Sequence, residues 1–299
     1  MAQHFHATGP AQAIQRQVLL AAPWIEPFLG AAGIGGNPRF ALARRAESVR
    51  RLRAGGQDWN RWAAALHELT RAAAASSLAE TIAAAAVSDF SGVAFATVAE
   101  FAGFIFPGDA LFGQARFQKE AYFNACAFHG VADFQQAAFA DAWFESGSFL
   151  QHSEFADTVW QNSAEFRNAR FAAPASFSGA AFGNDIWASG SVFDGPVTFE
   201  DARFGGEAGF GNIEFRDRAI FAGACFHGNA GFQRCRFAAD VSFQNALFER
   251  KAWFGNTYFG GTVRFDLARF RGDMDFSGID VESQAGNDDL KRIAGQRRA

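Results

Sequence analysis

Three cysteines and the histidines of two FHG tripeptides are the side chains of this sequence that metal binding or nucleophilic chemistry could use. Cys126, Cys225 and Cys235 have spacings that fit neither a metal-binding motif nor a paired disulfide framework. His129 and His227 each follow a Phe but stand far apart in the chain. The sequence therefore predicts no metal site, no cofactor and no disulfide.

Motifs of catalysis are missing as well. The chain contains no G-x-S-x-G, H-E-x-x-H, P-loop or G-x-G-x-x-G motif, and its run GAAGIGG lacks the strand-then-helix context of a phosphate-binding loop. Carboxylates are numerous, but acid–base catalysis needs a pair in different surroundings, and no spacing here indicates one. The sequence predicts a protein that is not an enzyme.

Phe dominates the sequence instead. Of its 37 Phe residues, 33 stand in a series of 35 slots from Phe90 to Phe276, and Trp160 and Trp187 occupy the other two. Successive slots alternate between spacings of five and six residues, and the residue two before a slot is usually Ala or another small or β-branched residue. Two inward residues separated by an outward one are typical of a β-strand. The pattern predicts a long series of short strands.

This pattern resembles that of the pentapeptide-repeat family, whose A-x-F/L-x-x units build a right-handed quadrilateral β-helix. The resemblance implies an all-β solenoid of about 8–9 coils over residues 88–280. The chain departs from the family pattern in using Phe where Leu is commoner, and 22 rather than 20 residues per coil. Upstream, LRAGGQDWNRW resembles a leader found before repeats in this family.

With 22 residues per coil, the slots form four ladders that begin at Phe90, Phe95, Phe101 and Phe106. Strands about 4.8 Å apart suit stacked rings, whose centroids prefer separations of about 4.5–7 Å. We therefore expect the Phe rings of each ladder to stack. One residue is missing in FADAWF, where slot 139 is followed by slot 144 of the next ladder. This gap predicts a local bulge or twist.

Residues 1–87 form an Ala-, Arg- and Leu-rich segment that we expect to be helical and to cap the solenoid. Asp58 is a candidate helix N-cap, and Ser77 with Glu80 forms a possible capping box before a helix over 77–87 that would cover the first coil. An open coil end would expose unpaired strand groups. Residues 281–299 are expected to form a polar C-terminal tail.

Charge and composition indicate where in the cell the protein acts and which kinds of partner it binds. A net charge of −4 argues against direct nucleic-acid binding. The odd cysteine count and the absence of a leader predict a cytoplasmic protein. Glu26 and two prolines interrupt the most apolar N-terminal run, which predicts no transmembrane segment. Two interpretations of the Arg-rich run RFALARRAESVRRLR stay open. The run either faces solvent or docks on the acidic solenoid, or it binds an anionic partner.

Outward residues of the third ladder carry the strongest functional signal. Register predicts an inward slot at Ala188, so Trp187 would point outward, whereas hydrophobicity favours burying Trp187 in the core. With Trp187 outside, the positions before the third-ladder slots form an aromatic and acidic face. Its candidate partner-binding residues are Glu100, Tyr122, Trp143, Glu165, Trp187 and Trp253.

These features favour a non-catalytic scaffold that presents a rigid acidic and aromatic face to an unknown protein partner. The resemblance also implies an alternative, a DNA mimic that occupies a type II topoisomerase, as some quinolone-resistance members of the family do. The net charge of −9 over residues 88–280, from 23 acidic and 14 basic residues, favours this alternative, whereas arginines on other sides oppose it. A third possibility is a self-assembling structural solenoid, so the protein would be a monomer or an end-to-end oligomer.

Overall fold

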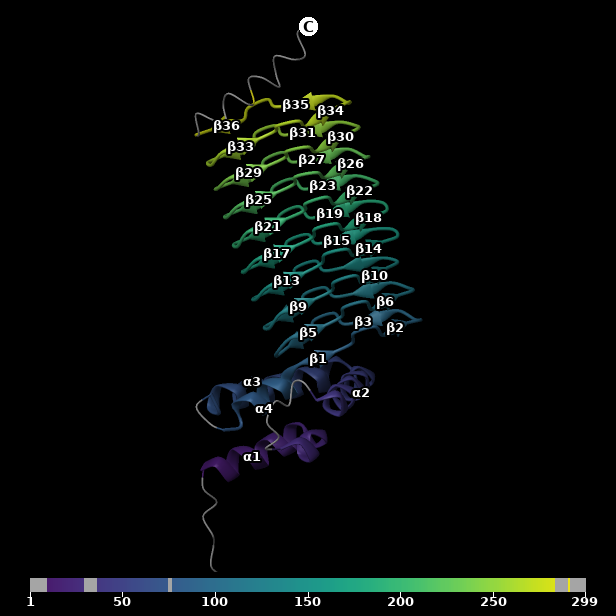
Figure 1. Cartoon of the computed structure of the whole chain (residues 1–299), viewed down its shortest axis with the longest axis vertical. Coiled ribbons are helices and arrows are strands. Elements are labelled where there is room, and N and C mark those ends of the chain that lie inside the picture. Colours follow the sequence, from purple (N-terminus) through teal and green to yellow (C-terminus); the bar gives the residue numbers. More distant parts are fainter. Residues whose placement is uncertain (1–9, 30–36, 75–76, 283–289, 291–299) are drawn as a thin grey trace, which may run out of the picture.

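The computed structural model describes residues 10–29, 37–74, 77–282 and 290. Figure 1 shows a column of stacked coils with helices gathered at its N-terminal end. Four parallel sheets of nine strands each form the sides of the column, and each strand pairs with the strand one coil before and after it. The fold is the quadrilateral β-solenoid of about nine coils that the sequence predicted.

The first two sheets follow the ladders of Phe90 and Phe95. The first sheet contains β1 (Ser88–Asp89), β5 (Ala110–Leu111), β9 (Ala132–Asp133), β13 (Ser153–Glu154), β17 (Ala175–Ser176), β21 (Val197–Thr198), β25 (Ala219–Ile220), β29 (Val241–Ser242) and β33 (Val263–Arg264). The second sheet contains β2 (Ala94–Phe95), β6 (Arg116–Phe117), β10 (Ala138–Phe139), β14 (Val159–Trp160), β18 (Ala181–Phe182), β22 (Arg203–Phe204), β26 (Cys225–Phe226), β30 (Leu247–Phe248) and β34 (Arg269–Phe270).

The other two sheets follow the ladders of Phe101 and Phe106. The third sheet contains β3 (Ala99–Glu100), β7 (Ala121–Tyr122), β11 (Ala142–Trp143), β15 (Ala164–Glu165), β19 (Ile186–Trp187), β23 (Ala208–Gly209), β27 (Ala230–Gly231), β31 (Ala252–Trp253) and β35 (Met274–Asp275). The fourth sheet contains β4 (Ile105–Phe106), β8 (Ala127–Phe128), β12 (Ser148–Phe149), β16 (Arg170–Phe171), β20 (Val192–Phe193), β24 (Glu214–Phe215), β28 (Arg236–Phe237), β32 (Tyr258–Phe259) and β36 (Asp280–Val281).

The core of the solenoid consists of the Phe ladders and the small residues two positions before them. In the first ladder, the ring centroids of Phe112 and Phe134 lie 4.8 Å apart, and those of Phe134 and Phe155 lie 4.9 Å apart, with nearly parallel planes. Across the coil, Phe144 meets Phe155 edge to face at 5.5 Å. All four rings are fully buried. The expected stacking of the rings is confirmed.

The alternation of five and six residues arises at the corners. After each slot of the first and third ladders, the second residue has a positive φ, as at Gln114 (59°) after Phe112. The N–H of Ala115 donates to the carbonyl oxygen of Phe112 at 2.9 Å, which completes a type II turn with two central residues. Corners after the second and fourth ladders instead have three residues before the next inward position, except after Phe139. The two corner types therefore set the two spacings.

The missing residue in FADAWF shortens one corner and leaves the strands intact. Ala138 and Phe139 still pair with the preceding coil, and Ala142 and Trp143 pair with Ala121 and Tyr122. Only two residues, in place of three, separate Phe139 from Ala142. The expected bulge is therefore wrong for these strands, because a corner can lose a residue without changing which side chains face inward, whereas the alternative of a local twist stays a prediction.

Among the N-terminal residues that the structure describes, five helices precede the solenoid: α1 (Pro10–Ala21), the 3₁₀ helix η1 (Pro23–Phe28), α2 (Pro38–Ala54), α3 (Gly56–Ala72) and α4 (Ala79–Ala86). Within the described ranges, none of the helices has the length and apolarity needed to cross a membrane. Two expected caps are wrong. Gly55 rather than Asp58 is the N-cap of α3, and α4 begins after Leu78 without the side-chain hydrogen bonds of a Ser77–Glu80 capping box.

The first coil is covered by α3, not chiefly by the predicted helix over 77–87. Trp59 is fully buried and packs its indole on the rings of Phe90, Phe104 and Phe106, at centroid distances of 6.0, 5.2 and 5.5 Å. Its Nε1 donates to the carbonyl oxygen of Ile105 at 2.8 Å. Helix α4 packs on α3 and leads directly into β1 (Figure 1).

Polar groups of α2 and α3 satisfy the open edge of the first coil. Asn60 accepts a hydrogen bond from the N–H of Ile105 and donates one to the carbonyl oxygen of Gly103, both at 2.9 Å. On α2, the Ser48 hydroxyl accepts from the N–H of Asp89 at 2.9 Å, and Arg44 pairs with the buried Asp89 carboxylate at 3.1 Å. Unpaired strand groups that would template association are thus capped.

The Arg-rich helix α2 therefore docks within the protein, which is one of the two interpretations that the sequence left open. Arg45 also lies 3.6 Å from the Asp89 carboxylate. Farther along the helix, the Arg51 guanidinium lies 4.6 Å from the ring centroid of Trp62 and donates to the carbonyl oxygen of Ala21 at 2.8 Å. These contacts join α1, α2 and α3 into one cap. The predicted tail 281–299 lies, apart from 281, 282 and 290, outside the described residues, as does the run GAAGIGG at 30–36.

Candidate partner-binding surface

The predicted site residues come together in the third sheet, where strand pairing places them in successive coils. We call the residues that precede the inward slots of this sheet the outer column. In order along the solenoid, they are Glu100, Tyr122, Trp143, Glu165, Trp187, Gly209, Gly231, Trp253 and Asp275. The first five are contiguous, whereas two glycines separate Trp253 from Trp187.

Tyr122 and Trp143 form one aromatic unit. Their ring centroids lie 4.9 Å apart with an angle of 17° between the planes. Both side chains are partly buried on the outside of the coil. Because each ring covers one face of the other, the pair presents its ring edges to solvent, which leaves less room for flat stacking of a sugar or a base than two separate rings would offer.

Trp187 lies on the outer face, as the register predicted, while Ile186 and Ala188 are buried at 1% and 3% exposure. A Cβ atom added to Gly209 would lie only 2.4 Å from the Trp187 indole, so this position in the next coil must lack a side chain. On the ring of Trp187, the Arg167 guanidinium lies 5.2 Å from the centroid. Trp187 is thus an outward residue held between its neighbours.

Glu165 separates the two aromatic groups of the outer column. Its carboxylate forms a close ion pair with Arg167, and its side chain is 13% exposed. Burial raises the pKa of Glu165, while the charge and hydrogen bond of Arg167 act in the opposite direction. Glu165, Arg167 and Trp187 therefore form a compact group in which a guanidinium meets both a carboxylate and an indole.

The charge of the third sheet differs from that of its neighbours. The outer column, the residues two after it and the corner residues two before it include nine acidic side chains and two basic ones. The acidic residues are Glu100, Glu120, Asp141, Glu145, Glu165, Asp185, Glu207, Asp273 and Asp275, and the basic ones are Arg167 and Lys251. Outward positions of the second and fourth sheets carry the arginines Arg116, Arg203, Arg269, Arg170 and Arg236. The same three kinds of position on the first sheet hold seven acidic and two basic residues, so two sides of the solenoid are acidic and the third sheet has the larger excess.

The cysteines and histidines do not converge on a ligand. The thiols of Cys126 and Cys235 donate to the carbonyl oxygens of Phe101 and Phe210, both at 2.9 Å. His129 instead faces His67 of α3, with ring centroids 5.3 Å apart, a contact that the repeat pattern could not reveal. Burial and the neighbouring His67 lower the pKa of His129. No group of three His, Cys, Asp or Glu side chains that could hold a metal ion occurs among the described residues.

The cysteine environments predict selective alkylation. Burial raises the pKa of Cys126 and of Cys235 to about 12, so at pH 8 these thiols contain almost no reactive thiolate. Cys225 is only partly buried. We expect iodoacetamide to modify Cys225 alone in the native protein and all three cysteines after unfolding, as counted by mass spectrometry. Rapid modification of two or three cysteines in the native protein would contradict the buried positions.

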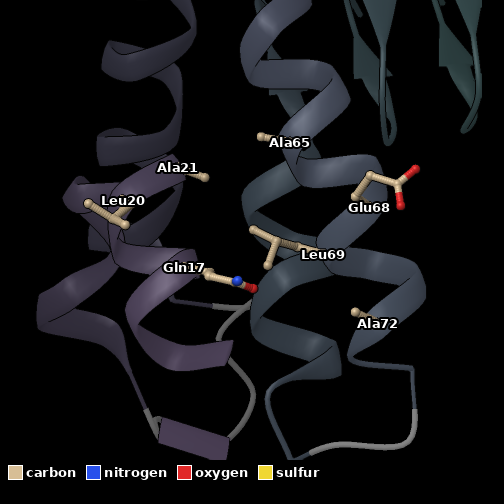
Figure 2. Close-up of a pocket in the computed structure, with 7 residues that line it drawn as sticks. All are labelled: Gln17, Leu20, Ala21, Ala65, Glu68, Leu69 and Ala72. Atoms are coloured by element: carbon tan, nitrogen blue, oxygen red, sulfur yellow. The ribbon is translucent and has the colours of Figure 1, made fainter. Parts of the chain in front are cut away.

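An apolar groove lies between α1 and α3 and is a further place where an active site could be sought. Figure 2 shows Gln17, Leu20 and Ala21 of α1 opposite residues of α3. The groove has a volume of about 490 Å³, and Glu68 is the one ionisable residue in its lining of Gln17, Leu20, Ala21, Ala65, Glu68, Leu69 and Ala72. A lone carboxylate offers no partner for acid–base or nucleophilic catalysis.

Comparison with known proteins identifies the repeats. Residues 155–203, 188–236 and 232–280 match the family model described as pentapeptide repeats (9 copies). Searches of the curated proteins and of the solved structures found no match. The matched residues lie in coils whose strand pairing continues back to β1 and β5, where Ser88 pairs with Ala110. This match over residues 155–280, together with the Phe slots and the four-sided coils, shows that the solenoid is built from pentapeptide repeats.

Proposed function

We propose that the protein is a non-catalytic scaffold that binds another protein through the outer column of the third sheet. The observation that carries this proposal is the Tyr122–Trp143 stack beside Glu165 and Trp187, on the side of the solenoid with nine acidic residues against two basic ones. Aromatic side chains dominate the binding energy of many interfaces. Because the coils fix these side chains in advance, binding would order few of them.

The DNA-mimic alternative has weaker support. The first and third sheets are both acidic, but the second and fourth sheets present exposed arginines such as Arg116, Arg203 and Arg236, and these positive charges have no counterpart on the backbone of duplex DNA. The self-assembly alternative is weakened at the C-terminal end, where Leu290 is 5% exposed and belongs to the same apolar core against which Phe276 packs. Neither alternative makes use of the exposed aromatic edges.

Affinity capture with aromatic variants tests the proposal. The full-length protein serves as bait in a lysate of the cells that make it, and Trp143→Ala and Trp253→Ala variants are used in parallel. We expect a protein retained by the parent bait to be lost or strongly reduced with Trp143→Ala, since truncation of an aromatic anchor costs about 2 kcal/mol or more of binding free energy. Trp253→Ala is expected to have a smaller effect, because two glycines separate it from the other rings.

Tyr258→Ala supplies the matched control. Tyr258 is a partly buried aromatic residue on the fourth sheet, and the Arg236 guanidinium lies 4.1 Å from its ring centroid. Its loss should leave capture unchanged, since it lies on a different side of the column. Equal capture by the parent and by both Trp variants, or equal loss with Tyr258→Ala, would reject the outer column as the binding surface.

A further inference from the structure

Two places in the third sheet have the same arrangement of a glutamate opposite an aromatic residue in the next coil. Glu165 pairs with Trp187, and Glu100 pairs with Tyr122 in the same parallel register. Tyr122 stacks on Trp143 with one ring face, so its other face is directed toward the coil of Glu100. Each glutamate therefore lies below one face of an aromatic ring.

The two places differ in the residue that follows. Arg167 stands two residues after Glu165, and its guanidinium contacts both the Glu165 carboxylate and the Trp187 ring. The equivalent residue two after Glu100 is Ala102, which is exposed. The place formed by Glu100 and Tyr122, the first along the chain, thus has the carboxylate and the ring but lacks an arginine like Arg167. Arg167 shows which group this arrangement accommodates.

A groove beside Glu100 has room for a side chain from another protein. It has a volume of about 480 Å³ between the α2–α3 junction and the first coil, and Glu100 is the one charged residue in its lining. Apolar walls come from Leu52, Phe95, Val98, Ala99 and Phe104. Arg and Lys side chains bury their aliphatic stems along apolar surfaces and keep the charged head near polar groups. The groove therefore suits a long cationic side chain.

We propose that Glu100, Tyr122 and the adjoining groove receive an arginine side chain of a protein partner, in the way that Glu165 and Trp187 hold Arg167. The proposal rests on the proposed function and adds the chemistry of the partner, a basic segment. The guanidinium forms a charge-assisted hydrogen bond with the Glu100 carboxylate and lies over the Tyr122 ring. The surrounding excess of acidic residues favours the approach of such a segment.

A fluorescein-labelled hexa-arginine peptide is the probe, and its binding to the full-length protein is followed by fluorescence anisotropy at low ionic strength. We expect Glu100→Gln to weaken binding at least about tenfold, because a charged contact is lost. Ala102→Arg should weaken binding to a similar extent by occupying the place with an intramolecular guanidinium. Arg at this turn position is compatible with the fold, since Arg167 occupies the equivalent position. A hexa-citrulline peptide should not bind.

Two further variants separate a specific site from general charge attraction. Ala172→Arg adds the same charge at an exposed alanine that follows a fourth-ladder slot, and it should change the affinity less than twofold. Arg167→Ala empties the second place and should raise the number of peptides bound per protein from about one to about two, because the two places have the same register. Thermal unfolding checks that each variant is folded.

Equal weakening by Ala102→Arg and Ala172→Arg, or unchanged binding by Glu100→Gln, would overturn the arginine site. The proposed function fails separately, when a captured protein is insensitive to Trp143→Ala. If capture depends on Trp143 but the peptide ignores Glu100, the scaffold proposal stands and the arginine site is rejected. If the peptide depends on Glu100 and capture does not depend on Trp143, the site stands as an isolated basic-residue receptor.

Discussion

Replacement of Phe155 by Ala should lower the free energy of unfolding by about 3–5 kcal/mol, the usual cost of truncating a fully buried Phe. Phe155 has no exposed surface and stacks between Phe134 and Phe177, with both centroid distances at 4.9 Å. It also meets Phe144 and Phe166 edge to face, each at 5.5 Å. The loss removes contacts within three successive coils. Chemical denaturation followed by circular dichroism measures it.

Phe276→Ala is the matched control for this substitution. Phe276 belongs to the last coil, is partly buried, and stacks on Phe254 at 4.9 Å. A terminal repeat contributes one inter-coil interface rather than two. We expect a destabilisation less than half that of Phe155→Ala. Similar effects at the two positions would show that ring stacking between coils does not determine the stability of the solenoid.

Replacement of Trp59 by Ala should be comparably destabilising, and it should also expose the first coil. The indole covers the rings of Phe90, Phe104 and Phe106, and Nε1 satisfies the carbonyl oxygen of Ile105. Truncating a buried Trp costs about 3–5 kcal/mol. Uncovered aromatic rings and strand edges promote association. We expect a lower unfolding temperature and oligomers in size-exclusion chromatography.

Two controls separate the effects of packing and of the hydrogen bond. Trp59→Phe keeps an aromatic ring but leaves the Ile105 carbonyl oxygen without its donor, which should cost about 1–3 kcal/mol. Arg61→Ala removes an exposed side chain of the same helix that pairs with Asp58, so its effect should lie within about 0.5 kcal/mol. If Trp59→Ala is no more destabilising than Arg61→Ala, α3 does not stabilise the first coil.

The periodic features of this fold could be predicted from the sequence because a strand has a fixed side-chain period. Two inward residues around one outward residue specified the Phe ladders, and the step of 22 residues, shortened to 21 once in each ladder, specified which residues lie above one another. The fate of the missing residue between Phe139 and Ala142 could not be predicted, since sequence spacing alone does not distinguish a shortened corner from a bulged strand. The same limit hid the turn geometry behind residues such as Gln114.

The contacts of each surface side chain were less predictable than the sheet and coil on which it lies. Register placed Trp187 outside, yet nothing in the spacing indicated that its indole lies between Arg167 of the preceding coil and Gly209 of the next coil. Trp59, Trp62, Leu66 and Leu69 recur at a helical spacing typical of a buried face, but this spacing does not say which residues the face packs against. Arg44, Ser48 and Asn60 look like ordinary solvent-facing residues in the sequence, because their roles depend on strand edges far along the chain.

The order of cap and coils along the chain has a consequence for biosynthesis. Every strand of the solenoid pairs with a strand that begins 21 or 22 residues earlier or later, as Ala121 does with Ala99 and Ala142. Helices α2 and α3 leave the ribosome before the first strand, so a completed template is available for β1 and β4 as they emerge. Each new turn of chain can then add to a finished surface while translation continues, without waiting for the C-terminus.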